Sequence, residues 1–361
     1  MTIINKLAIH QFRNLNQQLI EPCSGINLFV GQNAQGKTNL IESIYYLGHN
    51  RSFKTNLIKE VIQQSHHRFQ IDAYVDEYKV RFEKSNKKTL IEINNNRVKH
   101  TSDLTKKLPI QIITPDKGFV VGGTPKNKRS YLDWGVFHVK PDTIEVYKKH
   151  NKVLKNINTL LQQGLSDQLD VWLLELAKLS VQINTERQAY LDLLSDTQQH
   201  YDFTTLHQLI PESSQFQYRF HSGWPKDIDT LDIQSVFDYL SKHKQSFIKY
   251  KSINYGIHKA NLYFSLQDRA EHEFSRGEQK TLSIVFWLTQ VALLLDLGIK
   301  PIVLIDDITS ELDNEKIQII LDYLDRLKVQ TFITNINQNP IIMNYENIKT
   351  FRVNSGMISQ D

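Results

Sequence analysis

The sequence predicts an α/β fold in which one α/β domain is interrupted by a helical insertion. Three observations predict this class. The apolar run Ile26–Val30 is followed by a glycine-containing loop and then by helical apolar spacing in Asn39–Leu47. Strand-like and helix-like segments alternate again in residues 262–334. Between these two regions, residues 142–194 carry a helical pattern.

The composition is that of an ordinary globular chain, and it excludes several classes of protein. Of 361 residues, 40% are hydrophobic and 23% are charged, which argues against a largely disordered chain. Cys23 is the only cysteine, so neither an internal disulfide nor a cysteine-based metal cluster can form. The formal net charge of +4 and the pI of about 8.8 permit an anionic partner without identifying one.

The chain offers no candidate for a membrane segment. The first residues lack a signal-peptide pattern, and the longest apolar stretch, Leu282–Leu295, is too short to span a bilayer. We therefore expect a soluble, cytoplasmic protein with no membrane partner.

The N-terminal part is rich in predicted strands, arranged as an early strand, two hairpins and a further strand. Asp76-Glu77 and Asn94–Asn96 provide the hairpin turns, and Arg13-Asn14 ends the first strand. The predicted strands are Leu7–Phe12, Phe69–Val75, Tyr78–Phe82, Leu90–Ile93, Arg97–Lys99 and Ile110–Ile113.

The middle of the chain is predicted to be mostly helical. Trp172, Leu176, Leu179 and Ile183 are spaced three or four residues apart, which places one apolar stripe against a core. The other predicted elements are the strand Gln215–Phe220, the helix Ile233–Phe247, the strand Leu262–Leu266, a long helix after Phe274, the strand Ile302–Ile305, the helix Asn314–Leu327 and the strand Thr331–Thr334.

The loop between the first buried strand and its helix carries the complete pattern G-x-x-x-x-G-K-[ST]. It reads Gly31-Gln32-Asn33-Ala34-Gln35-Gly36-Lys37-Thr38 and is followed by Asn39. Glycines let the backbone wrap a phosphate closely, and loop amides with a helix N-terminus stabilise anionic oxygens. Lys37 should reach the terminal phosphates, and Thr38 should ligate Mg²⁺. An ordinary glycine turn is the alternative, but it does not account for the strand and helix on either side.

Two carboxylates, Asp306 and Asp307, follow the apolar strand Ile302–Ile305. Sheets of α/β proteins place their ligands at this end of a strand. We expect Asp306 to hold Mg²⁺, directly or through water, and Asp307 to orient or deprotonate an attacking water. An apolar strand ending in two acids is more often a capped turn when it stands alone, but the phosphate loop reverses that preference.

A second anion-binding pattern precedes the long C-terminal helix. Ser275-Arg276-Gly277-Glu278-Gln279 supplies a hydroxyl, a glycine amide and a helix N-terminus. Ser275 and Glu278 also have capping-box spacing, so a simple N-cap is the alternative. Because one nucleotide does not easily need two complete phosphate loops from one chain, we expect a second protomer to supply this motif.

Together these motifs resemble those of the ABC-type ATPases, and within them the SMC and Rad50-like DNA-maintenance group. Phe12–Leu15, Pro115–Asp133, Gly256–Lys259 and Ser310–Asp313 extend the likeness to essentially the whole chain. It implies an ABC-type P-loop ATPase head without a long coiled coil. Its two lobes would be a mixed-sheet lobe I, residues 1–124 and 256–361, and an inserted, mostly helical lobe II, residues 125–255.

The resemblance also implies roles for residues that are ambiguous by themselves. Arg13 and Asn14 would approach the nucleotide, and Ser310–Asp313 would form a loop that crosses a dimer interface. Thr334-Asn335 stands where many ABC ATPases carry a switch histidine, and Asp307 stands where many relatives carry glutamate. Both differences point to slow hydrolysis. Asp116 is the nearest candidate for a Q-loop residue.

The implied function is ATP-dependent DNA binding in recombinational repair. ATP and Mg²⁺ would join two heads into a homodimer that clamps duplex DNA near single-strand gaps with weak sequence preference. Slow, DNA-stimulated ATP hydrolysis would release the DNA. Bacterial recombination mediators of this group act with RecR and RecO, which load RecA, so we expect these partners and an association with the nucleoid.

Two other functions remain possible from the sequence. The chain could be the ATPase subunit of a membrane transporter, although the long insertion between Thr38 and Ser275 argues against it. It could also be a nucleotide-gated scaffold with incidental hydrolysis. Several basic clusters could contact DNA phosphates, although each alone is more typical of a solvated surface. They are Lys84-Lys87-Lys88, Lys126-Lys128-Arg129, Lys148-Lys149 and Lys242-Lys244.

Overall fold

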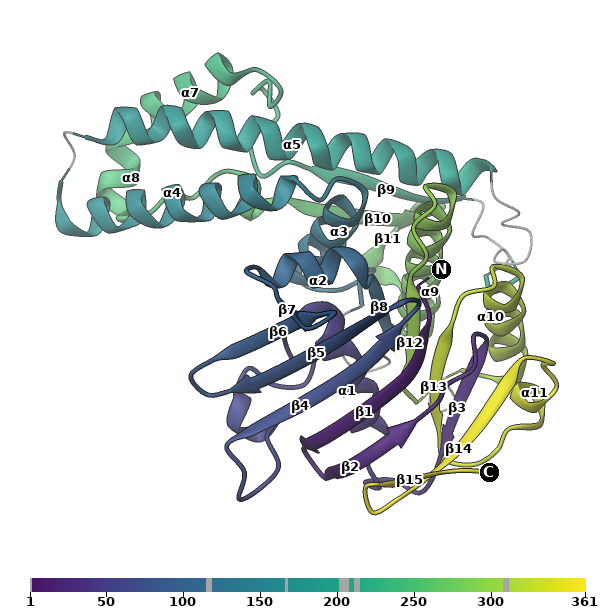
Figure 1. The fold of residues 1–361 in the computed structure, drawn as a ribbon. Helices are drawn as coiled ribbons and strands as arrows, with labels where there is room; N and C mark the ends of the chain where they lie inside the picture. The colour runs from purple at the N-terminus through teal and green to yellow at the C-terminus, as the bar shows by residue number, and fades with distance from the viewer. Residues whose placement is uncertain (1, 115–118, 166–167, 201–207, 211–214, 308–311) are drawn as a thin grey trace. The chain divides into compact units, whose positions relative to one another are not determined.

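The computed structural model divides the chain into two compact units (Figure 1). The residues it describes are 2–361 except 115–118, 166–167, 201–207, 211–214 and 308–311. The first unit comprises Met1–Lys117, Asp202–Pro211 and Ile284–Asp361, and the second comprises Gly118–Tyr201 and Glu212–Ser283. Residues 256–283, which the sequence predicts to belong to lobe I, therefore group with the helical unit. The predicted segments Pro115-Asp116 and Ser310-Glu311 lie outside the described residues.

The first unit contains an antiparallel six-stranded sheet in the order β2-β1-β4-β5-β6-β7. Its strands are β1 (Ile4–Phe12), β2 (Leu15–Ile20), β4 (Arg68–Val75), β5 (Tyr78–Ser85), β6 (Thr89–Ile93) and β7 (Asn96–Arg97). Both predicted hairpins are confirmed. Arg13-Asn14 does not simply end a strand but forms the turn between β1 and β2, and β2 was not predicted.

A second, mixed sheet in this unit has the order β15-β14-β3-β13-β12-β8. Its strands are β3 (Ile26–Val30), β8 (Ile110–Ile113), β12 (Ile302–Ile305), β13 (Thr331–Asn335), β14 (Ile348–Asn354) and β15 (Met357–Gln360), and only β15 is antiparallel to its neighbour. Asn335 pairs with Val30, and Ile305 pairs with Ile333. The carboxyl ends of β3, β13 and β12 therefore meet at one edge, where the phosphate loop and Asp306-Asp307 begin.

The helices of this unit are α1 (Lys37–His49), α2 (Thr101–Lys107), α10 (Asn314–Arg326), α11 (Pro340–Met343) and the short 3₁₀ turn Ile58–Glu60. Residues of α1 and α2 share a core with both sheets. Tyr46 of α1 packs edge-on against Phe12 and Phe69, with ring centroids 5.8 Å and 5.1 Å away. Such aromatic contacts add to the burial energy and fix the angle at which α1 leaves the loop.

The second unit is mainly helical, with a small sheet in the order β11-β10-β9. Its elements are α3 (Pro125–Val139), α4 (Thr143–Gln163), α5 (Leu169–His200), β9 (Phe216–His221), α7 (Ile233–Lys242), α8 (Lys244–Tyr250), β10 (Asn261–Leu266), β11 (Arg269–Ala270) and two 3₁₀ turns, Ile257–Lys259 and Glu271–Glu273. The helix α9 (Arg276–Asp296) contains the boundary between the units.

The apolar stripe predicted on α5 is confirmed, because Leu176, Leu179 and Ile183 are buried. The single helix predicted over Ile233–Phe247 is wrong, since the helix breaks at His243. The ring of His243 hydrogen-bonds to the carbonyl oxygen of Tyr239, 2.8 Å away. This local contact accompanies the departure of His243 from helical dihedral angles.

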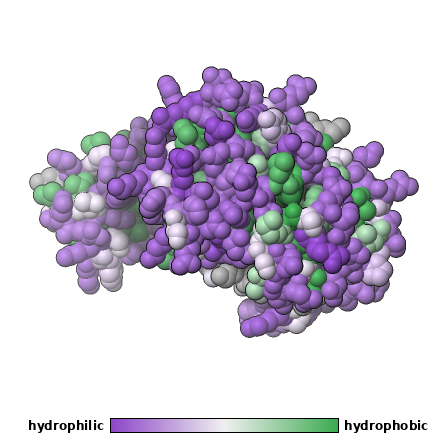
Figure 2. Space-filling model, turned by 60° about the horizontal axis from the view of Figure 1, so that its bottom comes forward, coloured by the Kyte–Doolittle hydropathy of each residue, from purple (hydrophilic) through white to green (hydrophobic). Residues whose placement is uncertain are grey.

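None of the described helices is both long enough and apolar enough to cross a bilayer. Figure 2 shows one face covered mostly by hydrophilic residues, with hydrophobic side chains in small groups.

Candidate nucleotide site

The phosphate loop leaves β3 and enters α1 through backbone that requires glycine. Gly36 caps α1 with φ of 118°, a left-handed angle that side chains disfavour. Gly31 donates to the carbonyl oxygen of Ile336 at 3.1 Å, and a Cβ at Gly31 would lie 2.2 Å from the carbonyl oxygen of Val353. Gln32, Asn33 and Ala34 are exposed between these glycines. The exposed part of the loop thus lies at the N-terminus of a 13-residue helix, where an anion would be stabilised.

The hairpin between β14 and β15 holds the loop from one side. The amide of Gly356 donates to the carbonyl oxygen of Gln35 at 2.8 Å, and the amide of Ser355 donates to Gln35 Oε1 at 2.6 Å. Ser355 and Gly356 both have positive φ, as a type I′ hairpin turn requires. This support was not predicted from the sequence, although Ser355-Gly356 between two alternating segments is a recognisable turn signal.

Asn14 contacts the loop, whereas Arg13 faces the helix behind it. Asn14 Nδ2 donates to the carbonyl oxygen of Gln35 at 3.1 Å, and Asn14 Oδ1 accepts from Asn39 Nδ2 at 2.8 Å. The Arg13 guanidinium forms a two-pronged ion pair with Glu42, whose side chain has no exposed surface. Glu42 was not among the predicted site residues, because an acid on a helix is normally exposed.

Lys37 is buried beside the start of the loop. Its Nζ donates to the carbonyl oxygens of Gly31 and Gln32 at 2.6 Å and 2.9 Å. In the described part of the chain it forms no ion pair with a carboxylate. Burial lowers the pKa of Lys37, an effect that Asp307 and Asp306 partly oppose. An anion at the loop would relieve this desolvation of the ammonium group.

Asp306, which follows β12, contacts residues of α1 and β13 through one carboxylate oxygen. Its Oδ1 accepts from Thr334 Oγ1 at 2.7 Å and from Thr38 Oγ1 at 3.1 Å. Burial raises the pKa of Asp306, and the hydrogen bonds from Thr334 and Thr38 oppose that rise. The amide of Asp307 donates to Thr334 Oγ1 at 2.8 Å. Thr38 and Asp306, 268 positions apart, are therefore in contact as their predicted roles require.

These residues fit a nucleotide with Mg²⁺. Thr38 and Asp306 provide a hydroxyl and a carboxylate, which are oxygen donors suited to Mg²⁺. Among the described residues there is no cluster of three or more His, Cys, Asp or Glu side chains that could hold a metal alone. The ion would therefore take its other ligands from phosphate oxygens and water, as is usual for Mg²⁺.

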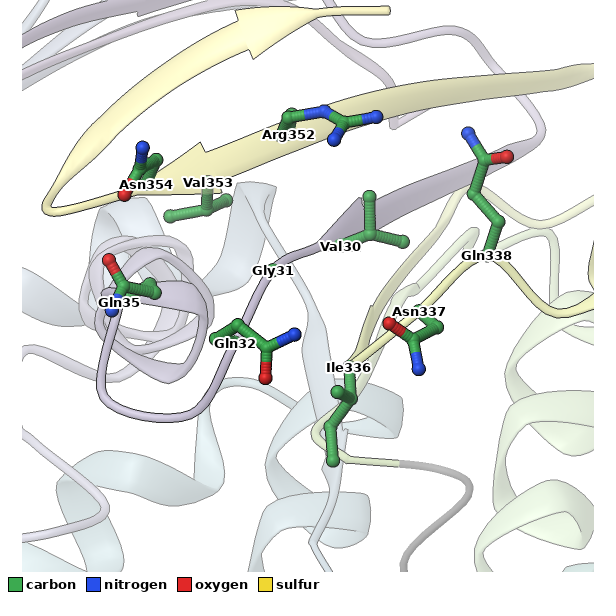
Figure 3. Close-up of a pocket in the computed structure, with 10 residues that line it drawn as sticks. All are labelled: Val30, Gly31, Gln32, Gln35, Ile336, Asn337, Gln338, Arg352, Val353 and Asn354. Atoms are coloured by element: carbon green, nitrogen blue, oxygen red, sulfur yellow. The ribbon is translucent and has the colours of Figure 1, made fainter.

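A pocket of about 580 Å³ opens beside the first half of the loop. Figure 3 shows that three segments surround it: the end of β3 with the loop, the segment after β13, and the end of β14. Its size is that of a small-molecule site. The lining residues are Val30, Gly31, Gln32, Gln35, Ile336, Asn337, Gln338, Arg352, Val353 and Asn354.

The motif Ser275–Gln279 lies in the second unit at the start of α9. Ser275, Arg276 and Gly277 are exposed. Ser275 Oγ accepts from the amide of Glu278 at 3.2 Å, and Glu278 Oε2 accepts from the amide of Ser275 at 2.8 Å. The capping box considered from the sequence is thus present. Hydrogen bonds from Arg269 and from the Ser275 amide lower the pKa of Glu278 to about 2.

The basic clusters differ in how far they are available to DNA. Lys84 Nζ donates to Asn50 O and Oδ1, both 2.8 Å away, and Lys128 is buried. Lys244 pairs with an acid, Asp170, at 2.9 Å. These lysines therefore already have partners within the fold and are less available to DNA phosphates.

Comparison with known proteins agrees with the family suggested by the motifs. A family model described as the RecF/RecN/SMC N terminal domain matches residues 3–359. The DNA replication and repair protein RecF of Actinobacillus succinogenes is 35% identical over 369 residues, covering 99% of both chains. The protein of the same name from Haemophilus influenzae is 32% identical over 370 residues, also covering 99% of both chains.

Solved structures agree on the fold. A structure described as the recombination mediator protein RecF-ATP in the RecFOR pathway has a TM-score of 0.84 and 24% identity, covering 100% of this chain and 99% of that chain. The Smc head domain of Pyrococcus furiosus has a TM-score of 0.57 and 14% identity, covering 100% of this chain and 96% of that one. These likenesses confirm the predicted ABC-type ATPase head. Taken with the full-length sequence matches, they lead to one conclusion: the chain belongs to the RecF family, within the RecF/RecN/SMC group.

Proposed function

We propose that this protein is an ATP-dependent DNA-binding protein of recombinational repair whose two heads close around ATP. The observation that carries the proposal is the contact of Thr38 and Asp306 beside the phosphate loop. It supports a Mg²⁺-nucleotide site made by one half of an ATP sandwich. The exposed motif Ser275–Gln279 supports the other half, because the same chain offers a second anion-binding surface in its other unit.

The residues of each half have distinct tasks. The loop amides and Lys37 would bind the phosphates, while Thr38 and Asp306 would hold Mg²⁺. ATP, when bound, supplies the phosphoryl bond whose hydrolysis ends the closed state. Asp307 would orient the attacking water and accept its proton, and Ser275 with Gly277 of the partner protomer would bind the terminal phosphate from the opposite side.

Turnover by this site should be slow. By resemblance, Thr334-Asn335 stands where many ABC ATPases carry a switch histidine, and Thr334 is engaged with Asp306 and the Asp307 amide. A threonine hydroxyl at this position cannot take up and release a proton near neutral pH as histidine can. We therefore propose a weak, DNA-stimulated ATPase in which ATP binding closes the dimer and hydrolysis releases it.

The partners follow from the family. Relatives carry the name DNA replication and repair protein RecF, and a related structure is assigned to the RecFOR pathway. We propose that the closed dimer holds duplex DNA near single-strand gaps with weak sequence preference, through phosphate contacts. RecR and RecO would then act on the same site and load RecA at the nucleoid.

The sandwich is tested by Ser275→Arg, which places a bulky cation at the proposed phosphate contact. The variant should bind ATP as a monomer with the affinity of the wild type and fail to dimerise in ATP, as measured by fluorescent-nucleotide titration and light scattering. Lys140→Arg, at an exposed residue of the same unit outside the motif, is the control. Wild-type dimerisation by Ser275→Arg would exclude Ser275 from the partner's nucleotide.

A nucleotide-gated scaffold with incidental hydrolysis is the second candidate, and Thr334 at the switch position favours it. Asp307→Asn separates the two functions, because it should abolish turnover while ATP binding and dimerisation remain. In the gated clamp, release of gapped duplex DNA then slows together with turnover. Release at the wild-type rate would leave the scaffold as the correct function.

A further inference from the structure

Lys128 is a buried cation in the second unit that the ATP motifs do not explain. Only 3% of its side chain is exposed, and its Nζ donates to the carbonyl oxygen of Leu262 at 2.7 Å. Nζ also donates to Glu271 Oε1 at 2.5 Å and lies 5.3 Å from the ring centroid of Phe264. A charge so deeply buried persists only where its partners compensate it. Glu271 is therefore the residue on which Lys128 depends.

Glu271 connects this cation to the loop in front of α9. Its Oε2 accepts from the amide of Gly122 at 2.8 Å, so both carboxylate oxygens are used. Its backbone carbonyl accepts from Gln279 Nε2 at 3.2 Å, and the same nitrogen donates to the carbonyl oxygen of Phe274 at 3.2 Å. Gln279, the last residue of the motif Ser275–Gln279, is thereby tied to the turn that carries Glu271.

The segment before α3 lies against the same motif. Gly122 has φ of 71°, and a Cβ there would lie 2.5 Å from Cδ of Gln279. The amide of Val121 donates to Ser283 Oγ at 3.0 Å, and Ser283 Oγ donates to the carbonyl oxygen of Gln279 at 2.7 Å. The first turn of α9 is thus held by contacts on its inner side, while Ser275 faces solvent.

We propose that Lys128 is a positioning residue for the motif Ser275–Gln279, acting through Glu271. The ammonium group fixes the carboxylate, the Glu271 turn fixes Gln279, and the motif then presents the Ser275 hydroxyl and the Gly277 amide at a set position. The proposal rests on the proposed function, in which this motif meets the nucleotide of a second protomer. It gives Lys128 a task that is separate from binding ATP within its own chain.

Loss of the ammonium group should loosen the motif rather than unfold the unit. The Glu271 side chain is 15% exposed and keeps the Gly122 amide, so without Lys128 it can turn toward water. A displacement of about 1 Å at a positioned contact can cost about a hundredfold. We expect Lys128→Met, which fills a similar volume, to weaken ATP-dependent dimerisation at least about tenfold and to leave ATP affinity of the monomer unchanged.

The experiment compares Lys128→Met with Lys128→Arg, Glu271→Gln and Lys140→Met. Arginine keeps the charge and can reach the same carboxylate, so Lys128→Arg should restore dimerisation. Lys140 pairs with Glu186 at 2.7 Å on the exposed surface of the same unit, which makes Lys140→Met the matched control. Dimer formation is followed by light scattering during an ATP titration, and fluorescent-nucleotide binding reports the monomer. Circular dichroism sets a temperature at which every variant is folded.

The outcomes separate this inference from the proposed function. Weak dimerisation by Lys128→Met with rescue by arginine supports the positioning role. Dimerisation within twofold of the wild type, while Ser275→Arg stays monomeric, overturns the inference and leaves the ATP sandwich intact. Full dimerisation by Ser275→Arg overturns both. If Lys128→Met does not fold, Glu271→Gln carries the same expectation, because it keeps the side-chain shape and removes the partner charge.

Discussion

The ion pair between Arg13 and Glu42 gives a stability prediction with a defined magnitude. Arg13 donates through Nη2 to Glu42 Oε1 at 2.7 Å and through Nε to Oε2, and the Ser52 hydroxyl also donates to Oε1. Arg13→Ala would leave a carboxylate with 0% exposure held by a single hydroxyl. Breaking one side of a buried ion pair costs about 3–5 kcal/mol. Because Arg13 is itself 18% exposed and its removal admits water, we expect the lower end, about 3 kcal/mol.

Urea unfolding at neutral pH, followed by circular dichroism, measures this loss. The double variant Arg13→Ala/Glu42→Gln should recover about half of it, since the buried charge is then removed together with its partner. Arg13→Lys should lie between the wild type and Arg13→Ala, because lysine keeps the charge but cannot bridge both oxygens. A loss below about 1 kcal/mol for Arg13→Ala, or no recovery in the double variant, would show that this ion pair does not stabilise the fold.

Three further predictions concern the loop and its carboxylate. Gly356→Ala adds a Cβ 2.1 Å from the carbonyl oxygen of Asn14 at φ of 80°, so it should cost about 1–3 kcal/mol in thermal unfolding and weaken ATP binding. Gly298→Ala, with φ of 76° and no atom within 4 Å of the added Cβ, is its control and should cost less. Lys37→Met should reduce ATP affinity by about 10- to 100-fold in a nucleotide titration without loss of stability, because the ammonium is desolvated and its hydrogen bonds to described residues go to backbone carbonyls. Burial raises the pKa of Asp306 above 3.8, so its contribution to stability is present at low pH and is lost as the pH rises through the higher value of the folded state. Asp306→Asn should therefore flatten that part of the pH profile of the nucleotide-free protein's melting temperature, and an unchanged profile would contradict this assignment.

Local patterns predicted the central elements of the fold well. The strand Ile26–Val30, the loop and α1 are adjacent in the sequence, so turn chemistry and apolar spacing were sufficient. The strand β2 was missed because Gln18 occupies an inward position in it and hides the alternation. Gln18 is 3% exposed, and its Oε1 accepts from the amide of Ile358 at 2.8 Å. The burial of the Gln18 side chain is explained by this contact with β15, a strand that is distant in the sequence.

The candidate site was predictable where the sheet itself brings residues together. Asp306 meets Thr38 because β12 ends at the same edge as β3, the strand that leads through the phosphate loop to Thr38, and the order of strand and acid already suggested this. The partners of Arg13 and Lys128 were not predictable, because Glu42 and Glu271 lie on segments whose patterns do not distinguish a buried acid from an exposed one. Burial of these ion pairs depends on tertiary packing across 29 and 143 positions of sequence.

In the proposed function, ATP joins two chains, and each chain completes the nucleotide site of the other. The most direct test is the molar mass of the wild-type protein by light scattering, first alone and then with saturating ATP and Mg²⁺. The chain mass is 42.2 kDa, and the account predicts a monomer without nucleotide and twice that mass with it. Gapped duplex DNA should bind only the larger species. A mass that stays at 42.2 kDa while ATP is demonstrably bound would contradict the account.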